Sequence, residues 1–364
     1  MKIAILSQGK YKPIGPFVRN YIANLPFEKI VIYGGEIPFL TGNFSEITIK
    51  IINQLILVLS FMNKERSFAI KRNIAKCILK RNKIDCVVGE YFNISSEFTS
   101  ICKGLGIKLI PIGLGYELTN DNVLKNYCKK YEELLTYSET SFVVSETLLT
   151  KLKILGVNTE NVKINPIGAE DIFFNLNPDF NTQTFLAIGR FVEKKAPHIT
   201  IKAFANVLRD FSNAKLIMAG DGPLLESSQQ LVKDLKIENS VVFVGWISRE
   251  EQIELIKKSS IFVQHSVVSK SGDSEGSPVA IIEASASGMP VISTFHAGIP
   301  KIILHEETGI LVNENDTDGM AKAMHQLVSN PIMARSFGSS GRKFILEHFS
   351  NKAHIKTFIN AINR

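Results

Sequence analysis

The stretch GDSEGSPVAIIEASASGMPVIST, Gly272 to Thr294, joins a glycine-bearing loop to an apolar helix and then to a strand. Ser277 is a residue type that caps helices, and Pro278 suits the first helical position, so we expect a helix from there to about Ser287. The run PVIST (290–294) that follows is typical of strands in a parallel sheet covered on both faces. The stretch therefore predicts one helix-to-strand step of an α/β sheet.

The same alternation of short apolar runs and helical patterns fills the second half of the chain. The predicted strands are TFLAIG (184–189), AKLIMAG (214–220), SVVFVG (240–245), SIFVQ (260–264), PVIST (290–294) and TGILV (308–312). Ser248 and Glu251 predict a capping box at the start of a helix. Residues 320–327 repeat apolar side chains at helical spacing. This order predicts a doubly wound α/β domain.

The first half repeats the pattern, which predicts a second Rossmann-like domain. Its predicted strands are MKIAILS (1–7), KIVIYGG (29–35), IDCVVG (84–89), IKLIPIG (107–113), SFVVS (141–145) and VKINPIG (162–168), with a helix over 122–137. The polar stretch NLNPDFNTQ (175–183) lacks periodicity. We predict domains over 1–176 and 184–345, a linker over 177–183, and a C-terminal helix over 346–364 that packs back on the first domain. Ligands are expected in a cleft facing the carboxyl ends of both sheets.

Length and composition agree with two globular domains, since the chain has 364 residues, 45% hydrophobic and 21% charged. The start, MKIAILSQGK, lacks the apolar region of a secretory signal. The run IINQLILVLSFM (51–62) is about half the length that spans a bilayer, so a core helix is expected there. The four cysteines show no metal or redox spacing, which predicts free thiols in a reducing compartment. A cytoplasmic protein, peripheral at the inner membrane face, is expected.

Positive charge is concentrated in one predicted helix, KERSFAIKRNIAKCILKRNK (64–83), which carries eight Lys or Arg and one Glu. Ile70, Ile74, Cys77 and Ile78 mark its predicted apolar face. One interpretation is contact with an anionic membrane surface or a phosphorylated lipid. The other is an ordinary solvated helix face. Nucleic acid is disfavoured because a single aromatic residue, Phe68, lies among these charges and no set of stacking aromatics interleaves with them.

Two common nucleotide motifs are missing from the sequence. The segments GLGYEL (113–118) and GDGPLL (220–225) lack the third glycine of a dinucleotide fingerprint, and no G-x-x-x-x-G-K-[ST] loop occurs. Dehydrogenase and P-loop chemistry are therefore disfavoured.

The helix beginning near Ser277 offers an anion site, because its first N–H groups and its dipole favour negative charge. Gly276 allows close approach of the backbone to a ligand. A diphosphate there would have Glu275 on one side and Glu283 on the other, one acid for a ribose diol and one for a sugar. The alternative pairs Glu283 with a structural Arg or Lys and leaves Glu275 solvated, and spacing does not decide between them.

Two further segments follow predicted strands. In GRFVEKKAPH (189–198), Arg190 and Lys195 lie at the carboxyl end of a strand and would neutralise a departing nucleoside diphosphate. The alternative is a pair of surface charges. In KPIGPFVRNYIANLP (12–26), Gly15 would let the loop cover a phosphate or sugar, although a Gly-Pro pair is usually only a turn.

Together these segments resemble the retaining glycosyltransferases of the two-domain GT-B class, family 4-like and of the colanic-acid or exopolysaccharide type. The likeness rests on LAIGRFVEKKAPH (186–198), LIMAGDGPL (216–224), VVFVGWISREE (241–251), SEGSPVAIIEASASGMPVIST (274–294) and AGIPKIILHEETGILV (297–312), and is looser in the first half. The E-x7-E element, Glu275 and Glu283, is its most recognisable mark.

The resemblance implies transfer of a sugar from a nucleotide sugar to a glycan or lipid-linked acceptor, with retention and without a metal or other cofactor. Arg190 and Lys195 would hold the diphosphate, and Glu283 the ribose. The donor sugar and its phosphates would bind Glu275 and the backbone of Gly276, Ser277, Pro278 and Val279. Trp246 and Ile247 would contact the base, UDP and GDP both remaining open. The leaving phosphate would take the acceptor's proton.

Two positions depart from the family's pattern. Leu114 stands where His is usual in LGYE, with Glu117 at the acid position, and Lys301 stands where Glu is usual. Two other functions therefore stay open: a catalytically silent sugar-nucleotide-binding partner in a glycan-assembly complex, and a sugar-nucleotide epimerase of related architecture. The sequence does not indicate the donor, the acceptor or the oligomeric state.

Overall fold

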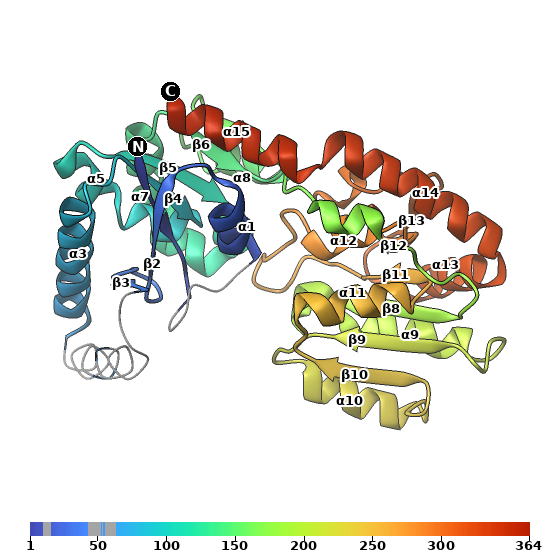
Figure 1. The fold of residues 1–364 in the computed structure, drawn as a ribbon. Helices are drawn as coiled ribbons and strands as arrows, with labels where there is room; N and C mark the ends of the chain where they lie inside the picture. The colour runs from blue at the N-terminus through green and yellow to red at the C-terminus, as the bar shows by residue number, and fades with distance from the viewer. Residues whose placement is uncertain (10–15, 43–51, 53, 55–62) are drawn as a thin grey trace. The chain divides into compact units, whose positions relative to one another are not determined.

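The computed structural model describes residues 1–9, 16–42, 52, 54 and 63–364. These residues form two α/β units, each with its own sheet and helices (Figure 1). One unit comprises Met1–Asn165 together with Ile355–Arg364, and the other comprises Pro166–His354. The predicted fold class of two Rossmann-like domains is confirmed.

The first unit is built on a sheet with the strand order β3-β2-β1-β4-β5-β6-β7. Its strands are β1 (Lys2–Leu6), β2 (Glu28–Tyr33), β3 (Leu40–Thr41), β4 (Cys86–Glu90), β5 (Lys108–Gly113), β6 (Ser141–Val143) and β7 (Val162–Ile164). Its helices are α1 (Pro16–Asn24), α3 (Lys64–Arg81), α4 (Phe92–Ser96), α5 (Thr99–Leu105), α6 (Tyr116–Thr119), α7 (Asp121–Tyr137) and α8 (Glu146–Ile154). The pairings are parallel except that of β2 with β3.

The last helix, α15 (Asn351–Asn363), supplies part of the core of the first unit. The ring centroid of Phe358 lies 5.2 Å from that of Tyr21 and 4.7 Å from that of Phe142. Ile355 and Ile362 join the same buried cluster. Residues from the end of the chain therefore complete the hydrophobic core beside the sheet that begins with β1.

The second unit has the strand order β10-β9-β8-β11-β12-β13, and its pairings are parallel. Its strands are β8 (Thr184–Ile188), β9 (Lys215–Ala219), β10 (Val241–Gly245), β11 (Ile261–Val263), β12 (Val291–Thr294) and β13 (Gly309–Val312). Its helices are α9 (Pro197–Val207), α10 (Leu225–Asp234), α11 (Arg249–Lys257), α12 (Val279–Ala286), α13 (Thr317–Ser329) and α14 (Pro331–His348), with short 3-10 turns η1 (Asp171–Asn175), η2 (Glu193–Lys195) and η3 (Ile299–Lys301).

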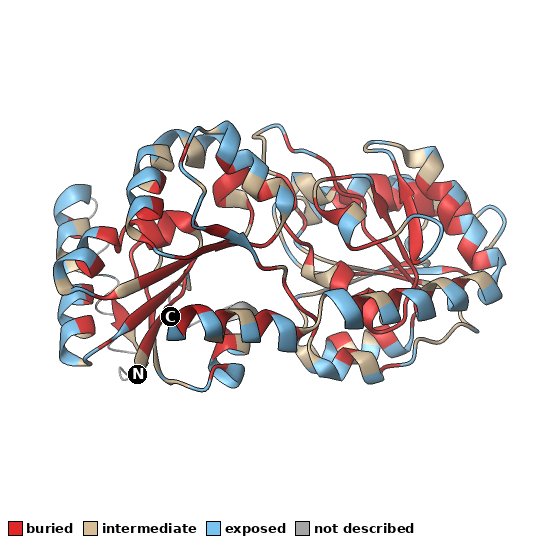
Figure 2. Cartoon of the chain, turned by 90° about the horizontal axis from the view of Figure 1, so that it is seen from above, coloured by how far each residue is buried: buried red, intermediate tan, exposed pale blue. Residues whose placement is uncertain are grey.

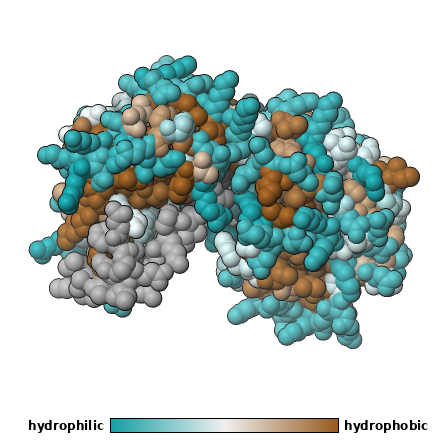
Figure 3. All heavy atoms as spheres, in the orientation of Figure 1, coloured by the Kyte–Doolittle hydropathy of each residue, from teal (hydrophilic) through white to brown (hydrophobic). Residues whose placement is uncertain are grey.

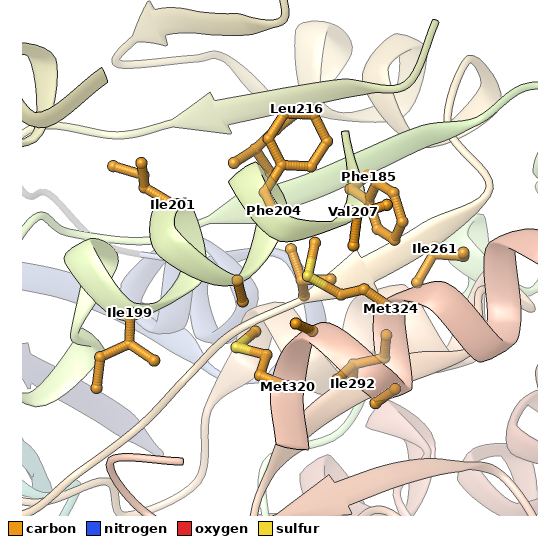
Figure 4. Close-up of a cluster of buried hydrophobic side chains, with 14 of the residues drawn as sticks. Phe185, Ile199, Ile201, Phe204, Val207, Leu216, Ile261, Ile292, Met320 and Met324 are labelled. Carbon is orange, nitrogen blue, oxygen red and sulfur yellow. The ribbon is translucent and has the colours of Figure 1, made fainter. Parts of the chain in front are cut away.

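The core of the second unit lies between α9, α13 and the sheet. Figure 4 shows Phe204 and Val207 of α9 in one cluster with Phe185 of β8, Leu216 of β9 and Met324 of α13. Figure 2 shows the same division throughout the units, with strands buried and one side of most helices exposed. Strands covered on both faces explain why they read as continuous apolar runs in the sequence.

The boundary between the two units lies earlier in the chain than the predicted linker. The chain leaves the first unit after Asn165, whereas residues 177–183 lie within the second unit. Arg342 of α14 donates to the carbonyl oxygen of Leu176, and the amide of Asp179 donates to the oxygen of Ser259 at 3.1 Å. Polar residues therefore attach this segment to the second unit, although their composition is typical of a linker.

The basic helix α3 forms as predicted, but its predicted apolar face is wrong in part. Ile74 and Cys77 are exposed, whereas Ser67, Ala75 and Leu79 are buried. The predicted core helix over 51–62 lies outside the described residues, apart from residues 52 and 54. Among the helices that the structure describes, none combines the length and hydropathy needed to cross a bilayer. Figure 3 shows hydrophobic patches scattered over a largely hydrophilic surface.

Candidate functional site

The candidate site lies where the second sheet changes direction. From β8 the chain continues to β9 and β10 on one side, and then to β11, β12 and β13 on the other. The carboxyl ends of β8 and β11 therefore form the topological switch point, where ligands of open α/β sheets bind. Arg190 follows β8, and Gln264 follows β11.

Lys195 and Glu275 meet at this switch point. Nζ of Lys195 lies 3.1 Å from Oε1 of Glu275 and donates to Oε1 of Gln264 at 3.0 Å. Only 16% and 8% of the two charged side chains are exposed. The sequence prediction placed both residues at a ligand site, and the structure brings them into direct contact.

The ion pair keeps Glu275 ionised. Burial raises the pKa of Glu275, but Lys195 and Lys194 outweigh this effect and bring the pKa below its usual value. Burial also lowers the pKa of Lys195, and the negative charge of Glu275 opposes this lowering. The result is a carboxylate that can accept hydrogen bonds beside a cation that can meet a phosphate.

A second lysine fixes the loop that carries Glu275. Nζ of Lys194 donates to Oδ1 of Asp273 at 3.0 Å and to the carbonyl oxygen of Ser274 at 3.2 Å. The two lysines are adjacent in η2, so a single short turn after β8 holds the loop at two points. The sequence analysis did not single out Lys194, although the repeated Lys of EKK was visible.

His296 and Glu314 hold the same loop through a chain of hydrogen bonds. Neither residue was predicted from the sequence to belong to the site. The amide of Glu275 donates to Nε2 of His296 at 3.1 Å. Nδ1 of His296 lies 2.6 Å from Oε1 of Glu314 and therefore carries the proton of that hydrogen bond. His296 is 1% exposed. Its place just after β12, at the carboxyl edge of the sheet, was the signal that could have identified it.

The helix that follows Glu275 starts one residue later than predicted. Pro278 is the N-cap of α12, and Val279 is its first residue, so Ser277 does not cap the helix. Gly276, Ser277 and Pro278 are buried. The amides of Ile281 and Ile282 donate to the carbonyl oxygen of Pro278 at 3.0 and 3.3 Å, which leaves those of Val279 and Ala280 as donors for an anion.

Glu283 is paired within the protein on both of its carboxylate oxygens. Oε1 accepts from Nη1 of Arg249 at 2.6 Å, and Oε2 accepts from Nε2 of Gln252 at 2.7 Å. Arg249 also donates to Glu170 at 2.6 Å. These contacts match the alternative in which Glu283 pairs with a structural cation, and its binding of a ribose stays a prediction.

Of the remaining predicted residues, Arg190 lines the same pocket as Lys195 and Gln264, and the others lie outside this cluster. Trp246 is 75% exposed and follows β10, the edge strand that β9 separates from β8. Ile247 is partly buried beside it, and Arg190 is exposed. Gly15 lies outside the described residues. The cluster therefore unites Lys195, Glu275 and the start of α12, with Arg190 on the preceding loop.

In the first unit, Glu117 holds its own loop. Its carboxylate accepts from the amides of Leu114 at 2.7 Å and Gly115 at 3.0 Å. Burial raises the pKa of Glu117 to about 7, against the lowering effect of these hydrogen bonds. Leu114 packs against the core of the first unit. Lys301, the other residue that departs from the family's pattern, lies in η3 and is exposed.

Comparisons with known proteins support the fold. The family model described as "Glycosyl transferases group 1" matches residues 169–344, which lie within the second unit. The expected resemblance is thereby confirmed, whereas retention of configuration and the roles of the two glutamates stay predictions.

Relatives and solved structures agree with this match. The chain is 27% identical over 220 residues to the putative colanic acid biosynthesis glycosyltransferase WcaL of Escherichia coli (strain K12), covering 60% of this chain and 54% of the relative. It is 28% identical over 223 residues to the amylovoran biosynthesis glycosyltransferase AmsK of Erwinia amylovora, covering 60% and 55%. The chain thus spans about half the length of these relatives.

One solved structure shows the fold over the whole chain. Anabaena Alr3699/HepE, crystallised in complex with UDP-glucose, has a TM-score of 0.78 and 16% identity, covering 100% of this chain and 99% of that one. The GT-B fold predicted from the sequence is therefore confirmed.

Proposed function

Because the family model for glycosyl transferases group 1 matches residues 169–344 of the second unit, we propose that the protein transfers a sugar from a nucleotide sugar to a glycan or lipid-linked acceptor. The product would be a cell-surface polysaccharide, as the names of WcaL and AmsK indicate for those relatives. The observation that carries the proposal is the buried Lys195–Glu275 pair at the switch point, beside the first turn of α12.

The donor's diphosphate would bind where three sources of positive charge converge. Lys195 is held at the switch point, Arg190 is exposed on the loop just before it, and α12 offers unpaired amides and the positive end of its dipole. Charge that develops on the leaving diphosphate is stabilised by groups already in place, which is the main contribution a protein makes to such a reaction.

The sugar of the donor would bind the carboxylate of Glu275, because it is ionised and accepts hydrogen bonds from hydroxyl groups. Glu283 would bind the ribose through any oxygen lone pair that Arg249 and Gln252 leave available. Trp246 and Ile247 would contact the base, for which the exposed indole of Trp246 is suited by its flat apolar faces.

We propose that the transfer keeps the anomeric configuration and needs no metal. The acceptor oxygen would form the new bond to the anomeric carbon on the face from which the phosphate oxygen leaves, and that phosphate oxygen would take the acceptor's proton. In this scheme the protein needs no nucleophile, and it acts by positioning the reactants and by stabilising the diphosphate charge. Lys195 and Arg190 supply the positive charge that a metal provides in other enzymes.

We also propose that α3 rests on an anionic membrane surface at the cytoplasmic side. Lys76, Lys80 and Lys83 are exposed, and the segment 64–83 carries eight basic residues against one acid. Each basic residue near such a surface contributes about 1 kcal/mol. A lipid-linked acceptor would be reached most easily from this position.

A panel of sugar nucleotides tests the donor proposal. UDP-glucose, UDP-galactose, UDP-N-acetylglucosamine and GDP-mannose are added separately, and the melting temperature is measured, since a ligand of the folded state raises it. We expect one of them to stabilise the protein and Arg190→Ala to weaken its affinity by about 10- to 100-fold, the effect of losing a hydrogen bond to a charged group.

The matched control is Arg209→Ala, which removes an exposed arginine of the same unit that follows α9. It should leave donor affinity unchanged. Release of nucleoside diphosphate is then measured with a lipid-linked glycan acceptor. Binding without release would indicate the non-catalytic partner, and conversion of the donor sugar without acceptor would indicate an epimerase. If no sugar nucleotide binds, the proposal is wrong.

A further inference from the structure

The first sheet has a switch point of its own, between β1 and β4. From β1 the chain continues to β2 and β3 on one side and then crosses to β4 on the other. Leu6 and Gly89 are register partners at the carboxyl ends of these strands. The next residues, Ser7 and Glu90, therefore lie next to each other at the position where open α/β sheets bind ligands.

Glu90 is the unusual residue at this point, because it is 3% exposed and its Oε1 has no hydrogen-bond partner among the described residues. The other buried glutamates have charged or amide partners: Glu97 has Arg72 and Lys130, Glu117 has two amides, and Glu283 has Arg249 and Gln252. Oε1 of Glu275 also lacks a hydrogen-bond partner among the described residues, but it lies 3.1 Å from Nζ of Lys195 in an ion pair, and Glu90 has no such cation. A buried polar atom without a partner destabilises the fold, so its presence needs an explanation.

Hydrogen-bonding side chains surround the same edge of the sheet. Tyr116, after β5, accepts through its hydroxyl from Gln8 at 2.8 Å and from Asn93 at 3.2 Å. Oδ1 of Asn93 is buried and lacks a partner within the described part of the chain. The ring of Tyr91 lies 5.3 Å from that of Tyr116. Unsatisfied acid and amide groups beside aromatic rings are the chemistry that recognises a sugar, through its hydroxyls and its apolar face.

The backbone at Tyr91 is strained in the same place. Tyr91 has a φ of 64° and a ψ of 132°, a left-handed conformation that residues with a side chain rarely adopt. Such conformations persist where the surroundings hold them and are enriched at binding sites. Tyr91 stands directly between Glu90 and the start of α4.

The electrostatics favour a neutral ligand over a cation. Burial raises the pKa of Glu90 to about 8, and among the described residues no positive charge compensates for it. At neutral pH the carboxyl group is therefore largely protonated, so it can donate one hydrogen bond and accept another. A hydroxyl group of a ligand can accept the hydrogen bond that the carboxyl group donates and donate the one that it accepts.

We propose that Glu90 binds a hydroxyl group of a sugar at the β1–β4 switch point, with Asn93 as a second polar contact. This sugar belongs to the acceptor if the proposed function holds. Neither residue stands out in the sequence, because the missing hydrogen-bond partner of Glu90 Oε1 is visible only in the folded unit.

Methyl glycosides of glucose, galactose, mannose and N-acetylglucosamine serve as probes, with binding measured by saturation-transfer NMR in the absence of nucleotide. We expect at least one to bind the wild type at millimolar concentration. Glu90→Leu should weaken it by about tenfold or more, because both hydrogen bonds are lost. Glu90→Gln keeps a donor and an acceptor and should stay within about threefold of the wild type.

Glu139→Leu is the control, since Glu139 is an exposed glutamate of the same unit. Thermal unfolding shows whether each variant is folded, and Glu90→Leu should melt no lower than the wild type because it removes an unpaired buried acid. Unchanged glycoside binding by folded Glu90→Leu would overturn the proposal, as would the absence of glycoside binding by the wild type. If Glu90→Leu does not fold, a loss larger than threefold in Glu90→Gln would contradict it.

This test is separate from that of the transfer reaction. Glycoside binding needs neither donor nor turnover. If nucleoside diphosphate is released but no glycoside effect is found, only the role of Glu90 is wrong. If glycosides bind through Glu90 but no sugar nucleotide is used, the transferase proposal is wrong and the sugar site remains.

Discussion

The two glutamates of the E-x7-E element, eight residues apart, have different surroundings in the folded protein. Glu275 lies in the loop before α12 and pairs with Lys195, whereas Glu283 lies within α12 and pairs with Arg249 and Gln252. Burial raises the pKa of Glu283, and Arg249 only partly opposes this effect. At Glu275 the lysines outweigh burial. The same residue type is thus available to a ligand at one position and held by the protein at the other.

Replacement of Glu283 by Gln should destabilise the second unit. The substitution leaves the partly buried guanidinium of Arg249 with Glu170 as its remaining acid, and removing one partner of a buried ion pair costs about 3–5 kcal/mol. Thermal unfolding measures the loss. Glu254→Gln is the control, because Glu254 is exposed and its pair with Lys257 contributes little.

Donor affinity measured on the same Glu283 variant separates its two roles. If the melting temperature falls while nucleotide-sugar affinity is unchanged, Glu283 is structural and has no part in donor binding. A weaker donor affinity would support the predicted ribose contact. An unchanged melting temperature would contradict the structural role that the contacts with Arg249 and Gln252 indicate.

At the scale of elements, the contacts of charged side chains determine which face of α3 is buried. Arg72 of α3 pairs with the buried Glu97, with which Lys130 of α7 also forms an ion pair. Lys71 lies over the ring of Phe39 at 5.4 Å. These contacts bring the side of Arg72 and Lys71 toward the protein and leave Ile74 exposed. Hydrophobic periodicity alone therefore assigned the wrong apolar face.

Lys76 and Lys80 stay exposed on α3, so they test its proposed contact with a membrane. The double variant Lys76→Glu and Lys80→Glu should lower binding to vesicles that contain phosphatidylglycerol by about tenfold or more, since each basic residue near the surface contributes about 1 kcal/mol. Co-sedimentation at moderate ionic strength measures it, and high salt should abolish the wild-type binding.

Lys125 and Lys129 of α7 provide a matched control. They are exposed, lie in the same unit and have the same spacing of four residues. Charge reversal at these two positions should change vesicle binding much less. Equal losses in both double variants would show that only net charge matters, and the assignment of α3 as the membrane-contacting helix would be wrong.

At the scale of the whole molecule, the last residues of the chain stabilise the unit that begins it. Phe358 is fully buried among residues of the first unit, so Phe358→Ala should cost about 3–5 kcal/mol there. Hydrogen exchange should rise in β1, β4 and β5, while the strands of the second unit keep their protection. Phe295→Ala, at a half-exposed phenylalanine of the second unit, is the control.

An increase in exchange confined to α15 itself would contradict this prediction. It would mean that the helix frays independently and that the first sheet is stable without it. A rise in exchange across the second unit would contradict it as well, because Phe358 belongs to the core of the first unit alone.

The sequence by itself determined the two α/β domains, most strand positions and the location of the candidate site. Strands buried on both faces must be short and apolar, and Gly, Ser and Pro before a helix restrict the backbone locally, so these features are written in neighbouring residues. The capping box at Ser248 and Glu251 was predicted for the same reason and is present. Lys195 and Glu275 could be placed at one edge because parallel strands end together.

Only the tertiary structure decided which partner each polar side chain takes. Glu283 meets Arg249, the backbone amide of Glu275 meets His296, and Glu90 meets no partner through Oε1 among the described residues, although nothing near them in sequence indicates this. The polar segment 177–183 joins the second unit through contacts with distant residues, and α15 completes the first. Hydrogen bonds and ion pairs depend on distances of a few ångströms between residues far apart in the chain, and only folding sets those distances.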